Sequence, residues 1–113
     1  MDSIRFKLSN STLTQMVNIE VFLNAEATMQ TSGLSNLAIK NQRIFAFTMN
    51  KRTIGRKEIN MLVESLECKI ELIKDEADRQ QRINKTGVQY NMLRKQLKEY
   101  TQLSKSLIKI ISS

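Results

Sequence analysis

Few residues in this chain have the types and spacing that catalysis or metal binding requires. The sequence contains no histidine and a single cysteine, Cys68, which excludes disulfide frameworks, zinc fingers and histidine-based triads within one chain. The carboxylates Glu71, Asp75, Glu76 and Asp78 lie close together, but they lack the oxygen-rich loop spacing of a cation site. We interpret them as the solvated ridge of a helix and predict no metal site.

The sequence also contains no motif for binding phosphate or a nucleotide. The glycines stand alone at Gly33, Gly55 and Gly87, which gives no phosphate-binding loop and no dinucleotide fingerprint. Cys68 lies within an apolar helical pattern and is typical of a small residue on a helix surface rather than of a reactive thiol. We therefore predict that the protein is not an enzyme and uses no cofactor.

Helices are the elements that must position any binding residues. Proline is absent from all 113 residues, and residues 56–111 repeat apolar residues mostly at alternating three- and four-residue steps with one glycine, Gly87. Such a narrow apolar seam is typical of a coiled coil. A single helix of about 55 residues would be about 80 Å long, so we expect a rod.

The first half of the chain carries a weaker helical stripe among many Ser, Thr, Asn and Gln residues. We predict a first helix over about residues 4–49, with a break or a kink near Ser32-Gly33, where a glycine can end a helix. Residues 4–8 alternate like a strand. Because nothing else looks like a strand that could pair with them, we assign them to the first turns of this helix.

A turn over about residues 50–56 divides the two halves, with Gly55 supplying the free backbone dihedral. A second helix over about residues 57–111 then completes a single domain, residues 1–113. The predicted fold class is all-α, a long antiparallel coiled-coil hairpin of two helices. In its register, partners across the seam have numbers that add to about 106, such as Phe47 with Ile59 and Leu13 with Leu93.

Charge is placed unevenly along the chain, whose net charge is +7. Residues 43–57 carry a net charge of +5, residues 58–81 a net charge of −4 and residues 82–113 a net charge of +6. Steps of three and four residues place each set of like charges on one helix face. The acidic column is Glu64, Glu67, Glu71, Asp75 and Asp78, and the basic column is Arg94, Lys98, Lys105 and Lys109.

The predicted register places Lys40 and Arg43 opposite the acidic column and leaves the basic column for a partner. The basic blocks also leave open a nucleic-acid-binding coiled coil or another assembly or adaptor protein. We regard nucleic acid as the weaker alternative, because aromatic residues are not interleaved with the basic ones and the acidic column would repel phosphate. No stretch resembles a signal peptide or reaches the roughly 20 apolar residues of a membrane span, so we expect no membrane insertion.

Residues 44–113 resemble a known family. The segment Phe47-Thr48-Met49-Asn50-Lys51-Arg52, followed by a heptad helix, Tyr90-Asn91-Met92-Leu93-Arg94-Lys95 and a lysine-rich tail, is similar to the C-terminal half of the FliJ/YscO-type central stalk proteins of type III secretion ATPases. The resemblance implies a non-catalytic rod that is inserted in the hexameric ATPase ring and links it to the export gate. It also implies a cytoplasmic protein that is peripheral to the membrane through the secretion complex, with secretion chaperones as further partners.

The resemblance assigns two partner-binding surfaces to this sequence. The end with both termini would enter the ring, and the basic column would meet an acidic ring lining. The hairpin apex would face the export gate with apolar residues flanked by charges, or else its Phe47 would simply close the seam. The expected apex residues are Phe45, Phe47, Met49, Lys51 and Arg52.

Overall fold

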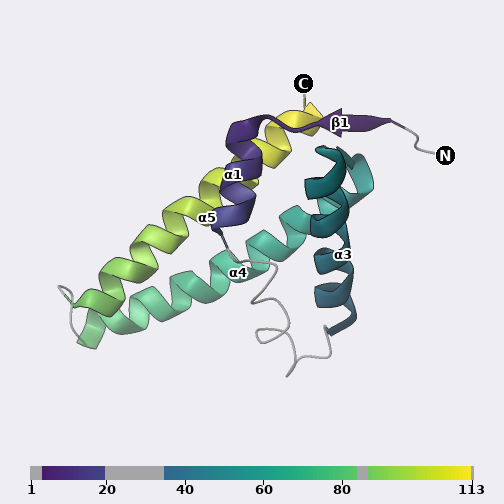
Figure 1. Ribbon diagram of the computed structural model, residues 1–113. Helices are drawn as coiled ribbons and strands as arrows, with labels where there is room; N and C mark the ends of the chain where they lie inside the picture. The colour runs from purple at the N-terminus through teal and green to yellow at the C-terminus, as the bar shows by residue number, and fades with distance from the viewer. Residues whose placement is uncertain (1–3, 20–34, 84–86, 113) are drawn as a thin grey trace.

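The computed structural model describes residues 4–19, 35–83 and 87–112. In chain order these residues form strand β1 (Arg5–Lys7), helix α1 (Asn10–Asn18), helix α3 (Ser35–Lys51), strand β2 (Thr53–Gly55), helix α4 (Arg56–Ile83) and helix α5 (Val88–Ser112). The fold is mostly helical and elongated, with principal extents of 50 × 30 × 22 Å. The two long helices, α4 and α5, lie side by side and antiparallel (Figure 1).

The seam between α4 and α5 holds the core of the molecule. Apolar residues of both helices recur at helical spacing on the faces that meet, so packing the two helices together removes one continuous stripe from water. The half-buried Leu93 and Leu97 extend the stripe toward the start of α5. The buried residues of the seam are Ile59, Leu62, Leu66, Ile70 and Ile73 of α4 and Tyr100, Leu103 and Leu107 of α5.

The predicted fold class, an all-α antiparallel hairpin, is confirmed, but the predicted helix boundaries are wrong. The hairpin forms within residues 56–112, where one continuous helix was expected, because α4 ends at Ile83 and α5 runs back along it from Val88. The four residues Asn84-Lys85-Thr86-Gly87 contain no apolar side chain, so the apolar stripe is interrupted there for one helical turn. Folding back lets each half of the stripe cover the other across a short connection, which has a small closure entropy.

The expected first helix over residues 4–49 is also different in the structure. Residues 5–7 form β1, which pairs antiparallel with β2, so that Arg5 lies opposite Gly55 and Phe6 opposite Ile54. The partner strand, β2, lies within the segment of residues 50–56 that was predicted to be a turn. Helix α1 begins only after Ser9, whose side chain caps the helix by accepting a hydrogen bond from the backbone N–H of Thr12 at 3.1 Å. The expected break near Ser32-Gly33 lies outside the described residues.

The connection between α3 and α4 falls where the turn was predicted, but its geometry depends on Arg52 rather than on Gly55. Arg52 has a positive φ of 59°, its N–H donates to the Thr48 carbonyl at 2.5 Å, and its own carbonyl accepts from the Leu8 N–H at 3.1 Å. At Gly55 no positive φ is needed, and an added Cβ would meet only the end of the flexible Glu58 side chain, which can move aside. The left-handed residue therefore ends α3 and directs the chain into β2.

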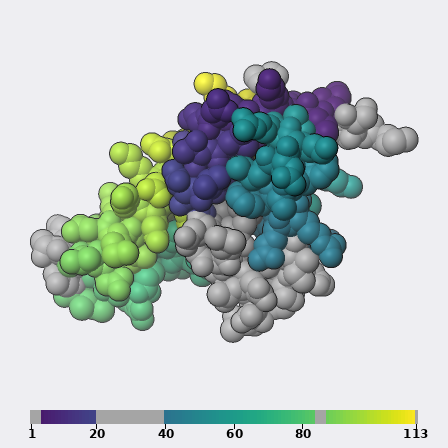
Figure 2. Space-filling model, in the orientation of Figure 1, coloured from purple at the N-terminus to yellow at the C-terminus, as the bar shows by residue number. Residues whose placement is uncertain are grey.

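The short elements pack around one end of the hairpin, which we call the base. Figure 2 shows α1 seated between α5 and α3, and the Ser106 hydroxyl donates to the Gln15 side chain at 3.3 Å. On the other side, the Asn41 side chain of α3 donates to Ser65 of α4 at 2.5 Å. The guanidinium carbon of Arg56 lies 5.3 Å from the centroid of the ring of Phe6, a residue of β1. The same guanidinium donates a hydrogen bond to the Ile111 carbonyl at 3.3 Å.

These contacts replace much of the predicted register. The numbers of the contacting residues Asn41 and Ser65 add to 106, as the predicted register requires. The register therefore holds where α3 crosses α4. Away from that crossing it is wrong: α1 lies beside the later part of α5, at Ser106, rather than beside Leu93. Phe47 is 48% exposed and does not close a seam with the fully buried Ile59.

Candidate partner-binding surfaces

The basic column occupies an exposed face of α5, as its spacing predicted. Arg94, Lys98, Lys105 and Lys109 are all exposed. They lie away from the buried positions Leu103 and Leu107, which face the seam and the base. Within the residues that the structure describes, no ion pair or hydrogen bond engages these four side chains. The column is therefore a ridge of like charge whose mutual repulsion is not offset by an ion pair within the described residues.

The acidic column occupies an exposed face of α4, also away from the seam. Lys40 and Arg43, which were expected opposite this column, are both exposed on α3 and form no ion pair with it among the described residues. Beside the column, Arg79 pairs with Glu76 at 2.7 Å. Hydrogen bonds from Arg79 and Gln80 lower the pKa of the Glu76 carboxyl. No group of three or more His, Cys, Asp or Glu side chains among the described residues is arranged to hold a metal ion.

The five expected apex residues do not lie at the tip of the hairpin. They lie at the C-terminal end of α3 and its junction with β2, within the base, whereas the tip is where α4 ends and α5 begins (Figure 1). Phe45 and Met49 are half-buried against the core cluster, and Lys51 and Arg52 are exposed. This correction follows from the position of the fold-back, which was expected 30 residues too early.

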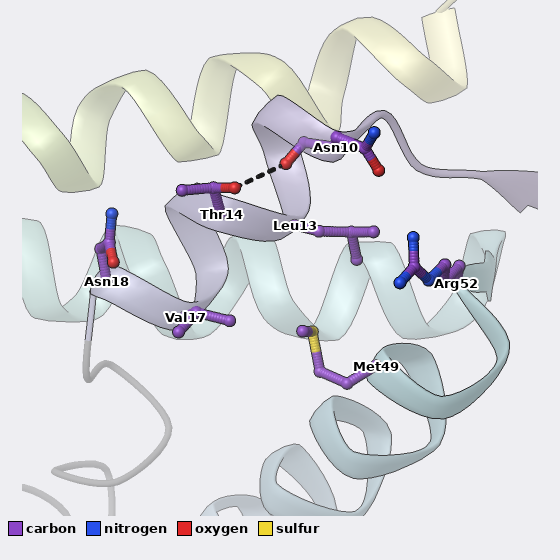
Figure 3. Close-up of a pocket in the computed structure, with 7 residues that line it drawn as sticks. All are labelled: Asn10, Leu13, Thr14, Val17, Asn18, Met49 and Arg52. Atoms are coloured by element: carbon purple, nitrogen blue, oxygen red, sulfur yellow. Dashed lines mark hydrogen bonds between the residues drawn. The ribbon is translucent and has the colours of Figure 1, made fainter.

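Met49 and Arg52 contribute to a cavity of about 300 Å³ between α1 and the end of α3 (Figure 3). Leu13 and Met49 point toward each other across it, and the Arg52 guanidinium lies at its edge beside them. Thr14 donates its hydroxyl hydrogen to the Asn10 carbonyl at 2.8 Å, so this side chain is already engaged within α1. The remaining lining residues are Val17 and Asn18. The cavity is an open apolar crevice with one cationic edge.

The tip of the hairpin exposes two apolar side chains, Ile83 and Val88. Ile83 was expected in the apolar seam, but it is 72% exposed and Val88 is 74% exposed, so neither lies in the buried seam. Cys68, farther down α4, is an exposed free thiol, as expected of a helix-surface residue. Lys69 beside it is half-buried; burial lowers the pKa of its ammonium, and the neighbouring Cys68 partly opposes this shift.

Sequence reasoning found the charged helix faces because charge periodicity depends only on helical spacing. It missed Arg5, Asn10 and Thr14 as lining residues, because strand β1 and helix α1 reach α3 only through long-range packing. No local pattern marks these contacts. The one available signal was the strand-like alternation of residues 4–8, which needed a partner strand to become informative.

Comparison with protein-family models, with curated proteins and with solved structures found no match for this chain. Among the described helices, none is both long enough and apolar enough to cross a membrane.

Proposed function

We propose that this protein is a non-catalytic helical-hairpin interaction protein, and that the basic column of α5 binds an acidic surface of a larger protein assembly. The candidate assembly is the hexameric ATPase ring of a type III secretion system, for which the protein would serve as the central stalk. The observation that carries the proposal is the exposed basic column, which has no ion-pair partner in the part of the chain that the structure describes. A partner that supplies carboxylates would relieve its repulsion.

The energetics favour a multivalent contact. One exposed ion pair contributes roughly 0–1 kcal/mol, so a single lysine would not hold a partner. Four cations on one helix face act together and also speed association through long-range attraction, which weakens as salt is added. The column spans about 22 Å of α5 between Arg94 and Lys109, at a rise of 1.5 Å per residue. A rigid helix presents these charges with little loss of conformational freedom on binding.

The arrangement of the base favours entry of the opposite end, the tip, into a ring. At the base, α1 packs against α5 and α3 packs against α4, so that end is wider than two helices. The tip consists of α4 and α5 alone and exposes Ile83 and Val88. In this proposal the tip enters the assembly, and the base, with Phe45, Phe47, Met49, Lys51 and Arg52, faces the export gate or secretion chaperones on the cytoplasmic side of the membrane.

A triple charge reversal tests the proposal. Arg94→Glu, Lys98→Glu and Lys105→Glu together should leave the helix content unchanged by circular dichroism, because all three side chains are exposed. Binding to a purified hexameric secretion ATPase, and any stimulation of its ATP hydrolysis, should be lost. The matched control reverses three charges on the other helix, with Glu64→Lys, Glu67→Lys and Glu71→Lys, and should retain binding.

Nucleic acid is the competing outcome of the same experiment. If the wild type bound duplex DNA at micromolar concentration, with affinity falling linearly against the logarithm of salt concentration, the reversal would flatten that slope by roughly one unit per lost phosphate contact. That result, together with no affinity for the ATPase, would replace the stalk proposal. Equal binding of the ATPase by the basic-column variant and the wild type would also contradict it.

A further inference from the structure

A second cavity, of about 330 Å³, opens between β1, α3 and the first turn of α4. It is separate from the crevice of Figure 3 and from the basic column. Two guanidinium groups, one carboxylate, one hydroxyl and two apolar side chains line it. These residues are Arg5, Arg43, Ile44, Phe47, Thr48 and Glu58. No motif in the sequence brings them together, because they come from three elements.

Arg5 is held in a fixed orientation inside this lining. Its Nε donates to the Thr53 hydroxyl at 3.0 Å, and its Nη2 donates to the Thr53 carbonyl at 2.9 Å. The plane of the guanidinium lies over the Phe47 ring, with 4.7 Å between Cζ and the ring centroid. These contacts use two of the five N–H donors of the side chain and leave the Nη1 edge without a partner among the described residues. A pre-oriented guanidinium edge matches the two oxygens of a planar oxyanion.

Thr48 lines the same cavity and carries an unsatisfied polar atom. The residue is 1% exposed, and its hydroxyl oxygen has no hydrogen-bond partner among the described residues. A buried hydroxyl without a partner costs roughly 1–3 kcal/mol. A ligand that accepts or donates a hydrogen bond at this position would recover that energy, so the hydroxyl favours a polar group inside the cavity.

The charges that line the cavity limit the charge of the ligand. Arg43 is exposed and makes no ion pair within the described residues, so its positive charge adds to that of Arg5. Glu58 is half-buried and contributes one negative charge. The lining therefore favours an anion but repels a doubly charged one more strongly than a singly charged one. Ile44 and the Phe47 ring offer apolar surface to the rest of the ligand.

We propose that this cavity binds a monocarboxylate carried on a short apolar body. The carboxylate accepts from the free edge of Arg5 and from Arg43, the Thr48 hydroxyl completes its hydrogen bonding, and the apolar body lies against Ile44 and Phe47. The C-terminal carboxylate of a peptide that ends in an apolar residue and a free aliphatic acid share this chemistry. The site is independent of the basic column and of its partner.

Chemical-shift perturbation of the ¹⁵N-labelled full chain tests the site with defined probes. Valerate should shift the backbone amides around Arg5, Phe47 and Thr48 in a saturable way, while neutral valeramide and inorganic phosphate should bind at least tenfold more weakly. An acetylated dipeptide ending in valine, compared with its amidated form, distinguishes the two sources of the carboxylate. If valerate and valeramide gave the same shifts, the proposal would be wrong.

Three variants separate binding from stability. Arg5→Met should lower valerate affinity at least tenfold, whereas Lys74→Gln, which removes one exposed charge elsewhere on α4, should leave it unchanged. Thr48→Val replaces the unpaired hydroxyl by a methyl group of similar shape, so it should weaken valerate binding while the melting temperature stays the same or rises. Arg5 also joins β1 to β2, so the Arg5→Met variant could fail to fold. In that case the Thr48→Val variant is the deciding one, and undiminished valerate affinity of Thr48→Val overturns the proposal.

Discussion

Arg52 shows how a single residue directs the path of this chain. A left-handed conformation costs a non-glycine residue roughly 1–2 kcal/mol, yet here it is occupied by arginine with a φ of 59°. Two backbone hydrogen bonds, to Thr48 and from Leu8, hold the residue in place. The strain is therefore opposed by the docking of β1 onto the end of α3.

Substitutions at Arg52 should reveal this strain. Arg52→Gly should be at least as stable as the wild type, because glycine adopts a positive φ freely. Arg52→Val should lower the free energy of unfolding by about 1–2 kcal/mol relative to Arg52→Gly, because a β-branched residue strongly disfavours this conformation. Urea denaturation measures the difference. Equal stability of the glycine and valine variants would show that the residue does not need a positive φ.

The half-buried Lys69 predicts a pH dependence of stability. Burial lowers the pKa of its ammonium below the ordinary value of 10.5, so in the pH range between the lowered pKa and 10.5 the unfolded chain binds more protons than the folded one. The contribution of Lys69 to the free energy of unfolding therefore rises with pH across that range. The free energy of unfolding of the wild type, minus that of Lys69→Met, should increase as the pH approaches 10.5. A difference that stays constant or falls would contradict the lowered pKa.

At the scale of elements, periodicity predicted the helical class and the seam but not where the chain folds back. Asn84, Thr86 and Gly87 have the composition of a turn, and the apolar stripe skips at the same place. A long coiled coil tolerates one such irregularity, so the local pattern alone did not decide between a straight helix and a hairpin. Burial decides, because α4 and α5 cover each other's apolar faces completely at Leu66, Leu103 and Leu107.

The two-stranded sheet lay beyond sequence reasoning for a different reason. Each strand has three residues, too few for alternation to be distinguished from chance. The pairing joins segments almost fifty residues apart and is fixed by the burial of Leu8 and Ile54 in the core. The cavity of Arg5 and Thr48 depends on this pairing, and so it could not be predicted either. The exposed basic column needed only helical spacing and was placed correctly.

Cross-linking can test the observed position of α1 against the register expected from the sequence. In a Cys68→Ser background, Gln15→Cys with Ser106→Cys should be joined within one chain by a short bismaleimide, because the two side chains are in hydrogen-bond contact. Leu13→Cys with Leu93→Cys, the pair of the expected register, should not be joined at the same reagent concentration. Mass spectrometry of the monomer band identifies the product. The reverse result would restore the long two-helix hairpin.

At the scale of the whole molecule, the fold separates the buried core from the exposed charged faces. The base concentrates β1, α1, α3 and the buried Ile54, Ile59 and Leu107 at one end. The arm beyond it is two helices thick, and the exposed acidic face of α4 and basic face of α5 run along it and continue beside the base, where Lys105 neighbours Ser106, which contacts α1. Neither column contributes to the core, so charge reversals on the arm can change partner binding without unfolding the base. This separation is what makes the proposed function testable by substitution.

The overall dimensions distinguish this architecture from a rod in solution. The Cα radius of gyration is 14.9 Å, somewhat above the value of about 13 Å expected for a compact chain of this length. A straight rod about 80 Å long, built around one helix over residues 57–111, would have a radius of gyration of about 23 Å. Small-angle X-ray scattering should therefore give a value near 15 to 17 Å after allowance for side chains and hydration, unchanged on dilution. A value above about 20 Å for the monomer would show that α4 and α5 form one continuous helix, and both the tip and the base would then have to be reassigned.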